Sequence, residues 1–591
     1  MRPKVLLTSV IRPFGGPGEG SSVGAELFHS QITRAQGPFS LRQVIRVWGL
    51  DYIAENLQAP TVVLHYPSMD ELRNELAHGS YSYVGINFVV ATFHKIRQMV
   101  PVIRELAPKA KIVLGGYGTV LPDEILTPWC DAICREEGVR YMQRLLGEPD
   151  DAPIKHPHAI VPVTSIIGYQ RRAVVGHVTA GLGCPNGCDF CCTSHFFRQK
   201  YVPLAETGRE IYEALMATRA QAQRDGVEMT GYALIDEDFF MHPKRVREFL
   251  DAVREGGEAL SIFGFGSTRG LSQFTVEEVA EMGFDLIWNA VEGERAGYRK
   301  QQGKSYADLY REMADVGVAM CTSMIIGFPY QDEVTIWREF EALMALEPSM
   351  IQCLIYFAFP GTPFHDQVIA EGRYLPEYTD KPDLRRWDGF SMPFRHPRIA
   401  DPKTVERIQQ AIYTEDFKRL GPSIVRLCEV WLRGWRSLRN SPNPLLRKRA
   451  EGFYYTVRQA LPIVTTAITF PPSEVAKARA VALKKAVINE MGALSLHERA
   501  VDAAAPLLYL ATAAARKLEV FQQPGLLRVE HRGGVPAYTA DALKLHPRSL
   551  ASVIEDTERH WYGAPEPPPA PHGELATTVA RPLGRSLPVV S

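Results

Sequence analysis

The chain has 591 residues, 46% hydrophobic and 23% charged, and its 66 basic and 67 acidic residues leave a net charge of -1. This is the composition of a globular protein with room for three or four domains at about 100–200 residues each. The balanced charge argues against a nucleic-acid-binding protein, which normally carries a strongly basic surface. The apolar runs near both ends are too short for a signal peptide or a membrane span, so we expect a cytoplasmic protein.

Residues 1–150 alternate short apolar strands with amphipathic helices. The strand-like runs stand at 4–9, 61–66, 83–90 and 111–116. Strands without alternating polarity are typical of a parallel sheet that is covered on both faces. Such sheets bind ligands at the carboxyl ends of their strands, where the chain places Gly85, Gly115 and Gly116. These glycines either let the backbone approach a ligand or only turn the chain.

The rest of the chain divides into four segments. A connector with several Pro and His residues at 151–175 leads to a second alternation of strands and helices at 176–380. Repeated βα units of this number predict a full or partial barrel, whose sites lie at the carboxyl ends of the strands. Residues 381–563 have a mostly helical pattern, and the Pro-rich residues 564–591 predict a disordered tail. We therefore predict an α/β protein with a Rossmann-like front domain, a partial (β/α) barrel and a helical C-terminal domain.

Four of the nine cysteines stand in GCPNGCDFCCTSHFF, residues 183–197. In a reducing compartment, cysteines are more often ligands, nucleophiles or core residues than disulfides. Zinc sites usually combine a CxxC with a second pair, and the sequence has no second CxxC. Three thiolates on one loop can instead bind three irons of a cubane iron–sulfur cluster. Such a cluster normally takes four cysteines, so three cysteines leave one iron without a protein ligand. A zinc or structural site remains the alternative.

The spacing Cys184-x3-Cys188-x2-Cys191, with aromatic Phe190 before the third cysteine, resembles the radical S-adenosylmethionine (SAM) superfamily. The resemblance implies that the three cysteines hold a [4Fe–4S] cluster whose open iron chelates the amino and carboxylate groups of SAM. Reduction by an external donor such as flavodoxin or ferredoxin would cleave SAM to methionine and a 5′-deoxyadenosyl radical. Phe190 would contact the adenine.

Four later segments resemble the superfamily's other SAM contacts, in the same order along the chain. They are ALIDEDFF at 233–240, FGFGS at 263–267, WNAVEGE at 288–294 and SMIIGFPYQDE at 323–333. The resemblance implies that they supply acids for the amino group, ribose or carboxylate contacts and adenine contacts. The implied SAM-binding residues, besides Phe190, are Asp236, Glu237, Ser267, Glu292, Ile326 and Gly327. Taken singly, each segment also fits an ordinary structural role, such as a solvated acid at a strand end.

The front domain resembles the cobalamin-binding domain that precedes the barrel in one branch of the superfamily. The similarity is carried by YVGINFVVATFHKIRQMVPVIRELAPKAKIVLGGYGTVLPDEIL at 83–126, and the loop FPGTPF at 359–364 is common in that branch. The implied cobalamin contacts are Gly85, Asn87, Gly115 and Gly116. The sequence lacks the Asp-x-His-x-x-Gly motif that supplies a lower ligand in many cobalamin proteins. A domain that kept the fold and lost the cofactor is the alternative.

Between Arg426 and Arg449, seven basic residues and one acid accompany Trp431 and Trp435. Such a stretch can make peripheral contact with a membrane, bind an anionic substrate, or simply cover the barrel.

The resemblance as a whole implies a cobalamin-dependent radical SAM methyltransferase. Its substrate would be a hydrophobic or anionic small molecule (a lipid, tetrapyrrole or natural product) that is methylated at an unactivated carbon. Radical cyclisation, rearrangement or carbon–carbon coupling without methyl transfer is one alternative. A non-catalytic binding or sensor protein is another.

Overall fold

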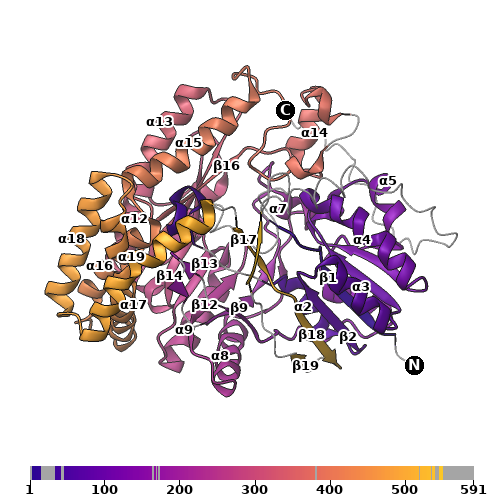
Figure 1. Cartoon of the computed structure of the whole chain (residues 1–591), viewed down its shortest axis with the longest axis horizontal. Helices are drawn as coiled ribbons and strands as arrows, with labels where there is room; N and C mark the ends of the chain where they lie inside the picture. The colour runs from indigo at the N-terminus through magenta and orange to yellow at the C-terminus, as the bar shows by residue number, and fades with distance from the viewer. Residues whose placement is uncertain are drawn as a thin grey trace.

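The computed structural model describes residues 3–14, 33–41, 46–162, 165–167, 169–170, 174–379, 383–517, 520–533, 535–538 and 545–549. Within these residues the chain forms two large, mostly parallel sheets and a helical C-terminal region. Figure 1 shows the first sheet in indigo, the second in the centre of the molecule, and the orange helices on the side away from the first sheet. The tail at 564–591, for which we expect disorder, lies outside the described residues.

The front sheet has the strand order β2-β1-β3-β4-β5, all parallel. These strands are β1 (Val5–Ser9), β2 (Thr61–His65), β3 (Tyr83–Asn87), β4 (Lys111–Gly115) and β5 (Ala132–Ile133). The helices around the sheet are α2 (Trp48–Asn56), α3 (Met69–His78), α4 (Phe93–Leu106), α5 (Asp123–Leu126) and α6 (Gly138–Leu146). Strand β2 lies on one side of β1 and β3 on the other, so the strand order reverses at β1. Doubly wound sheets bind ligands at such a switch point.

The C-terminal region returns to this sheet, which the sequence analysis did not anticipate. Strand β18 (Leu527–Arg532) pairs antiparallel with β2, and β19 (Val535–Tyr538) follows it at the edge. Arg528 anchors the strand through Glu75, with 2.7 Å between Nε and Oε2. Alternate side chains of β18 are buried, a pattern typical of a strand with one face on a core. The added strand covers backbone groups of β2 that would otherwise form an open sheet edge.

The second sheet contains six parallel strands that lie side by side in chain order. They are β9 (Val174–Thr179), β12 (Met229–Ile235), β13 (Ile262–Phe265), β14 (Phe284–Glu292), β15 (Ala319–Ile326) and β16 (Met350–Ile355). The connecting helices are α8 (Gly208–Arg224), α9 (Pro243–Gly256), α10 (Thr268–Leu271), α11 (Val276–Glu281), α12 (Tyr306–Asp315) and α13 (Glu333–Met344). Consecutive βα units in this order form a partial barrel, as expected. Strand β6 (Ala159–Pro162), from the segment expected to be a connector, pairs antiparallel with β9.

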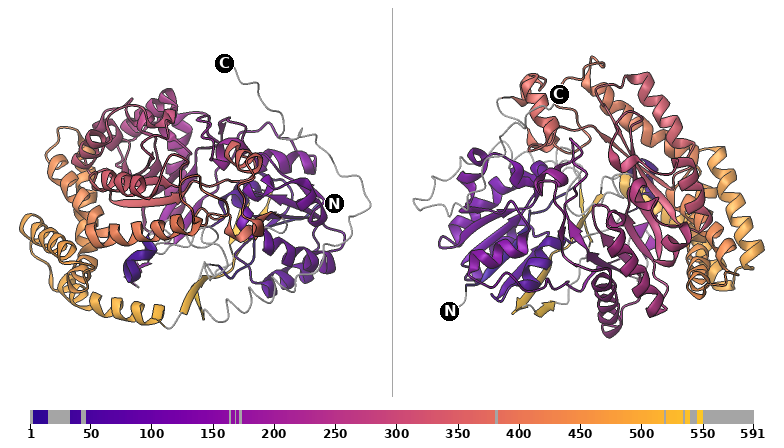
Figure 2. Two further views of the ribbon diagram at one scale, coloured as in Figure 1. Left: turned by 90° about the horizontal axis from the view of Figure 1, so that it is seen from above. Right: turned by 180° about the vertical axis from the view of Figure 1, so that it is seen from behind.

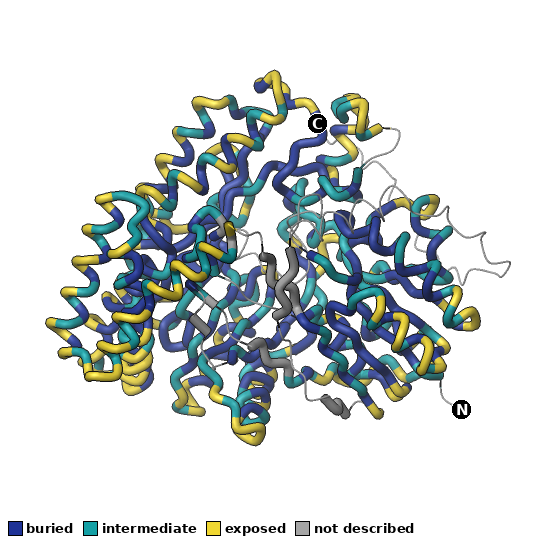
Figure 3. The backbone as a smooth tube through the Cα atoms, in the orientation of Figure 1, coloured by how far each residue is buried: buried dark blue, intermediate teal, exposed yellow. Residues whose placement is uncertain are grey.

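Five long helices form the C-terminal region and cover the barrel's helical layer (Figure 2). They are α15 (Pro402–Leu420), α16 (Ser423–Leu438), α17 (Pro444–Thr469), α18 (Glu474–Met491) and α19 (Leu496–Lys517). Side chains of α16 and α17 share one hydrophobic core with those of α12. Figure 3 shows the strands of both sheets as buried, whereas exposed residues lie along the outer helices.

Two arginines at the ends of the basic and aromatic stretch, Arg426 and Arg449, are buried, whereas its other five basic residues are exposed. Arg426 forms an ion pair with Asp416 at 2.7 Å and donates to the Pro348 carbonyl at 3.0 Å. Arg449 donates to the carbonyl oxygens of Leu260 and Phe284 at 3.0 and 2.8 Å. The stretch therefore joins the helical region to the barrel. Among the described helices, none combines the length and apolar character needed to cross a bilayer.

Candidate functional site

The cysteine-rich loop lies at the carboxyl end of β9, where a barrel places its functional groups. After β9 the chain forms β10 (Gly181–Leu182), the loop itself and α7 (Cys192–Phe196), and returns through β11 (Val202–Pro203), which pairs with β10. Gly183 has φ +78°, and a Cβ there would lie 2.3 Å from the carbonyl oxygen of Lys200. Only glycine fits so close a backbone approach in the left-handed region. The loop is therefore tightly wound against the strand that follows it.

The thiols of this loop are buried together. Cys184 and Cys188 are 8% and 4% exposed, and Cys191 is half-buried. Burial raises the pKa of Cys184 to about 12 and that of Cys188 to about 11. Thiols of this kind keep their protons at neutral pH until a bound metal displaces them. Asn186 Nδ2 donates to Cys184 Sγ at 3.2 Å, the type of hydrogen bond that tunes a ligating sulfur.

Zinc sites and iron–sulfur clusters place their ligands differently. Within the described part of the chain, no three His, Cys, Asp or Glu side chains converge closely enough to hold one metal ion. A zinc ion needs its ligands around a single centre. In a cubane cluster each thiolate binds a different iron, so the sulfurs stand farther apart. Three cysteines on one loop, two of them buried and one half-buried, are a suitable donor set for three irons of such a cluster.

Asp189, between two of the cysteines, anchors the loop to the barrel. Its two carboxylate oxygens accept hydrogen bonds from the hydroxyls of Tyr298 and Tyr356, both at 2.6 Å. Tyr298 follows β14 and Tyr356 follows β16, so the two phenols reach the loop from different strands. The backbone N–H of Phe364, at the start of α14 (Pro363–Ala370), donates to the Asp189 carbonyl at 3.1 Å. The sequence analysis missed Asp189, because its partners lie more than a hundred residues away.

Removing both phenol hydroxyls should loosen this loop. A hydrogen bond to a charged group contributes about 1.5–3 kcal/mol, so we expect Tyr298→Phe combined with Tyr356→Phe to hold reconstituted iron and sulfide less firmly. The measurement is the rate at which air bleaches the visible absorbance of the reconstituted protein. Tyr330→Phe is the control, since its hydroxyl contacts Glu339 instead of the loop. A double variant that bleaches as slowly as the control would show that Asp189 does not anchor the loop.

The two acids at the end of β12 have different environments. Asp236 forms a buried ion pair with Arg245 at 2.7 Å and accepts from the Tyr201 hydroxyl at 2.7 Å. Glu237 is exposed and accepts no hydrogen bond from the described residues. Partial desolvation and the neighbouring Asp236 carboxylate raise its pKa to about 7. Of the two candidates, Glu237 is available to a ligand, whereas Asp236 holds the strand end in place.

Ser267 is engaged in local structure. Its backbone N–H donates to Asp238 Oδ1 at 3.0 Å, and its Oγ accepts from the N–H of Gly270 as the cap of α10. Burial raises the pKa of Asp238 to about 6. The pair lies at the carboxyl ends of β12 and β13, on the same edge of the barrel as the cysteine loop.

Glu292 ends β14 in a strained conformation, with φ +59°, which is uncommon for a residue other than glycine. Its buried carboxylate forms an ion pair with Lys300. Burial by itself would lower the pKa of Lys300, but Glu292 and the nearby Cys188 thiol hold it above its usual value. The Lys300 ammonium also lies 5.7 Å from the ring centre of Phe190. Lys300, which has no motif to mark it, thus joins Glu292 to the cysteine loop.

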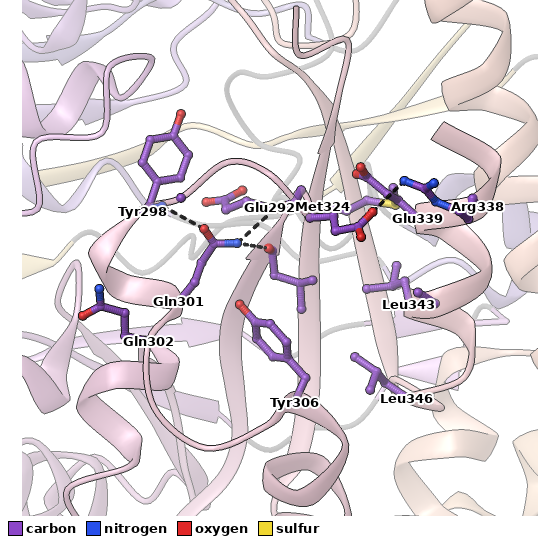
Figure 4. Close-up of a pocket in the computed structure, with 15 residues that line it drawn as sticks. Glu292, Tyr298, Gln301, Gln302, Tyr306, Met324, Arg338, Glu339, Leu343 and Leu346 are labelled. Atoms are coloured by element: carbon purple, nitrogen blue, oxygen red, sulfur yellow. Dashed lines mark hydrogen bonds and ion pairs between the residues drawn. The ribbon is translucent and has the colours of Figure 1, made fainter. Parts of the chain in front are cut away.

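A cavity of about 680 Å³ opens beside Glu292. Figure 4 shows Gln301 and Tyr306 on one side of the cavity. On the other side lie Leu343 of α13 and Leu346, which follows that helix. Glu292 therefore stands between this cavity and the cysteine loop.

Aromatic rings connect the loop with the end of β15. The Phe190 ring centre lies 5.8 Å from that of Tyr356, which in turn lies 4.4 Å from that of Phe328. Ile326 is fully buried at the strand end, and Gly327 turns the chain with φ +84°. The structure thus brings Phe190 to the strand end that the sequence predicts for the adenine contact.

The predicted cobalamin contacts occupy two kinds of position. Asn87, Gly115 and Gly116 lie at the carboxyl ends of β3 and β4, and a Cβ on Gly116 would lie 2.7 Å from the Phe88 carbonyl oxygen. Gly85 lies within β3, where its missing side chain makes room for Leu7. The first three can face a ligand at the switch point, whereas packing within the sheet accounts for Gly85.

The two candidate cofactor regions adjoin each other. The turn η3 (Tyr117–Val120) follows β4 of the front sheet, and the ring centre of Tyr117 lies 5.2 Å from that of Phe196 in α7. Burial, together with the nearby Glu237 carboxylate, raises the pKa of Tyr117. A Cβ on Gly361, in the FPGTPF loop, would lie 3.6 Å from Val120. The ligand-binding edge of the front sheet therefore faces the cysteine loop.

No family model matches this sequence. The bacteriochlorophyllide d C-12(1)-methyltransferase of Chlorobaculum tepidum is 22% identical over 249 residues, which are 40% of this chain and 51% of the relative. The chain therefore spans about half the length of this curated relative.

Two solved structures of the radical SAM methyltransferase TsrM from Kitasatospora setae align with 78% of this chain and 100% of theirs, at 14% identity. One has cobalamin and a [4Fe–4S] cluster bound, with a TM-score of 0.49, and the other has tryptophan and a SAM analogue bound, with a TM-score of 0.48. Methylornithine synthase (PylB) aligns with 43% of this chain and 68% of its own, at 15% identity and a TM-score of 0.24. These superpositions are too loose to transfer the role of any residue.

Proposed function

We propose that this chain is a cobalamin-dependent radical SAM enzyme, a methyltransferase that acts on an unactivated carbon of a small molecule. The observation that carries the proposal is the contact of Tyr117 with Phe196. This contact supports a position of the front sheet's switch-point edge beside the loop that carries buried Cys184 and Cys188 and half-buried Cys191, at the carboxyl ends of the barrel strands. Methyl transfer with two cofactors requires such an arrangement, because both must reach the same substrate carbon.

Each cofactor has residues of suitable chemistry. Cys184, Cys188 and Cys191 would bind three irons of the cluster, while Asp189 holds their loop in place. The carboxylate of Glu237 would accept the amino group of SAM, and Phe190 would cover the adenine. Together these groups would supply a carbon-centred radical when the cluster is reduced, and cobalamin on the front sheet would supply the methyl group. No step depends on which ligand the lower face of cobalamin has.

The protein's own residues also shield one side of the cysteine loop from water. The aromatic side chains between the two domains and the FPGTPF loop against Val120 restrict access to the cysteine loop. Exclusion of water protects reactive intermediates from side reactions. Glu237 is the acid in this space that has no protein hydrogen-bond donor among the described residues, which is why we assign it to the ligand.

The inner side of the barrel favours a hydrophobic substrate. Phe265 stacks on Trp288 with ring centres 5.7 Å apart, and Phe263 lies 5.2 Å from Phe265. Phe263 and Phe265 are half-buried, although strands of a covered parallel sheet are usually buried throughout. Two of the arginines that the sequence analysis considered for an anionic substrate, Arg426 and Arg449, are buried in ion pairs within the fold instead. The aromatic side chains therefore favour a substrate with a flat, hydrophobic part.

The test is an anaerobic product assay with reconstituted protein, SAM and titanium(III) citrate. We expect 5′-deoxyadenosine in all reduced samples. We expect S-adenosylhomocysteine only when cobalamin is present, because a second SAM would have to replace the methyl group that cobalamin gives up. 5′-Deoxyadenosine without S-adenosylhomocysteine would indicate radical chemistry without methyl transfer. Neither product, from protein that has taken up its iron and sulfide, would contradict the proposal.

A further inference from the structure

An exposed turn with two basic residues follows the cysteine loop and α7 in the chain. Arg198, Gln199 and Lys200, which follow α7, are exposed, as is Pro185 within the loop itself. Within the described part of the chain, neither Arg198 nor Lys200 pairs with an acid. The loop that carries the cysteines therefore reaches the surface beside two uncompensated positive charges.

The backbone of this turn is held in a rare conformation. Arg198 and Gln199 are consecutive residues in the left-handed region, with φ +54° and +56°. Left-handed conformations are unfavourable for residues other than glycine, and adjacent ones are rarer still. The conformation is fixed by hydrogen bonds from the N–H groups of Arg198 to the His195 carbonyl at 2.9 Å and of Gln199 to the Ser194 carbonyl at 2.7 Å. Strain of this kind is found where the position of a side chain matters for function.

The turn is also in direct contact with the loop. The carbonyl oxygen of Lys200 lies 2.3 Å from where a Cβ of Gly183 would be, and the Gln199 side chain lies 3.1 Å from the corresponding position at Gly187. These two glycines immediately precede Cys184 and Cys188. A protein that docks on the turn would therefore stand one layer of backbone away from two of the proposed cluster ligands.

We propose that this turn, with Arg198 and Lys200, is the docking site for an acidic one-electron carrier protein of the flavodoxin class. The inference rests on the proposed function, which requires one electron to cleave each SAM. The carrier's reduced flavin loses that electron and the oxidised cluster gains it, so no other reactant is needed. Arg198 and Lys200, which have no acidic partner among the described residues, favour a partner with a negative surface, because complementary charge accelerates association.

The experiment compares two reductants. The double variant Arg198→Glu with Lys200→Glu is tested beside Lys403→Glu with Lys485→Glu, which makes the same change of charge at exposed positions on α15 and α18. Binding of oxidised flavodoxin is measured by calorimetry at low and high salt. Cluster reduction is followed by stopped-flow absorbance, first with reduced flavodoxin and then with titanium(III) citrate.

At low salt, we expect the turn variant to bind flavodoxin about tenfold more weakly than the wild type and to be reduced by it about tenfold more slowly. High salt should weaken flavodoxin binding by the wild type and so reduce this difference, because it screens the charges. Reduction of the turn variant by titanium(III) citrate should equal that of the wild type, because a small reagent needs no docking site. Equal flavodoxin binding by the turn variant, the control variant and the wild type would overturn the docking proposal. If titanium(III) citrate reduces no cluster in the wild type, the proposed function itself fails, which is a distinguishable result.

Discussion

The Cys188→Ala protein is expected to cleave no SAM above the rate without enzyme. Removing one of three ligands leaves two cysteines for a cluster that normally needs four protein ligands and has at most three here. Because Cys188 is small and buried in the loop, the substitution should change the folded structure little. Iron and sulfide content after reconstitution, together with 5′-deoxyadenosine production, measures the effect.

Cys192→Ala is the matched control for that variant. Cys192 is adjacent to Cys191 and half-buried, but it begins α7 and stands outside the three-cysteine spacing. We expect this protein to keep its iron and its SAM cleavage. Equal loss in both variants would mean that the cysteines act as a group in another way, for example as a four-thiol structural site.

The largest expected change in stability follows from Arg426→Met. Arg426 and Asp416 have side chains that are 1% and 4% exposed, with 2.7 Å between them. Removing one partner of a buried ion pair leaves the other charge without compensation, at a cost of about 3–5 kcal/mol. Arg426 also bonds to Pro348 in the barrel, so we expect a lower unfolding midpoint and an earlier separation of the helical region. Urea titration followed by circular dichroism and by tryptophan fluorescence measures both.

The double variant Asp416→Leu with Arg426→Met separates the charge effect from packing. If the unpaired carboxylate causes the loss, removing it as well should restore much of the stability. A single variant as stable as the wild type would contradict the role that we assign to this pair.

Local sequence patterns were sufficient to predict both sheets. The apolar runs of β1 to β4 and the repeated βα units each carry their signal within a few residues, and the cysteine spacing is confined to one loop. Strand β18 was missed because the helical pattern before it dominated the region, although Leu527 to Arg532 do alternate between buried and less buried positions.

The residues that support the site could not be predicted in the same way. Asp189 and Lys300 acquire their importance from partners on other strands, and no short motif encodes such contacts. The same limit applies to Arg426, since a pattern of charges does not reveal that Asp416 lies across the turn between α15 and α16. The sequence favours Glu237 over its neighbour Asp236 as the acid for the amino group, but it does not reveal that Asp236 pairs with Arg245.

The most direct test of the account is electron paramagnetic resonance of the reduced, reconstituted protein before and after SAM is added. A cluster held by Cys184, Cys188 and Cys191 has one iron without a protein ligand, so SAM should bind there and change the spectrum. The account predicts a reduced [4Fe–4S] signal whose g-values shift with SAM and do not shift with 5′-methylthioadenosine at the same concentration, because that compound lacks the amino and carboxylate groups that would bind the open iron. A protein that contains zinc in place of iron, or a cluster signal that SAM leaves unchanged, would contradict it.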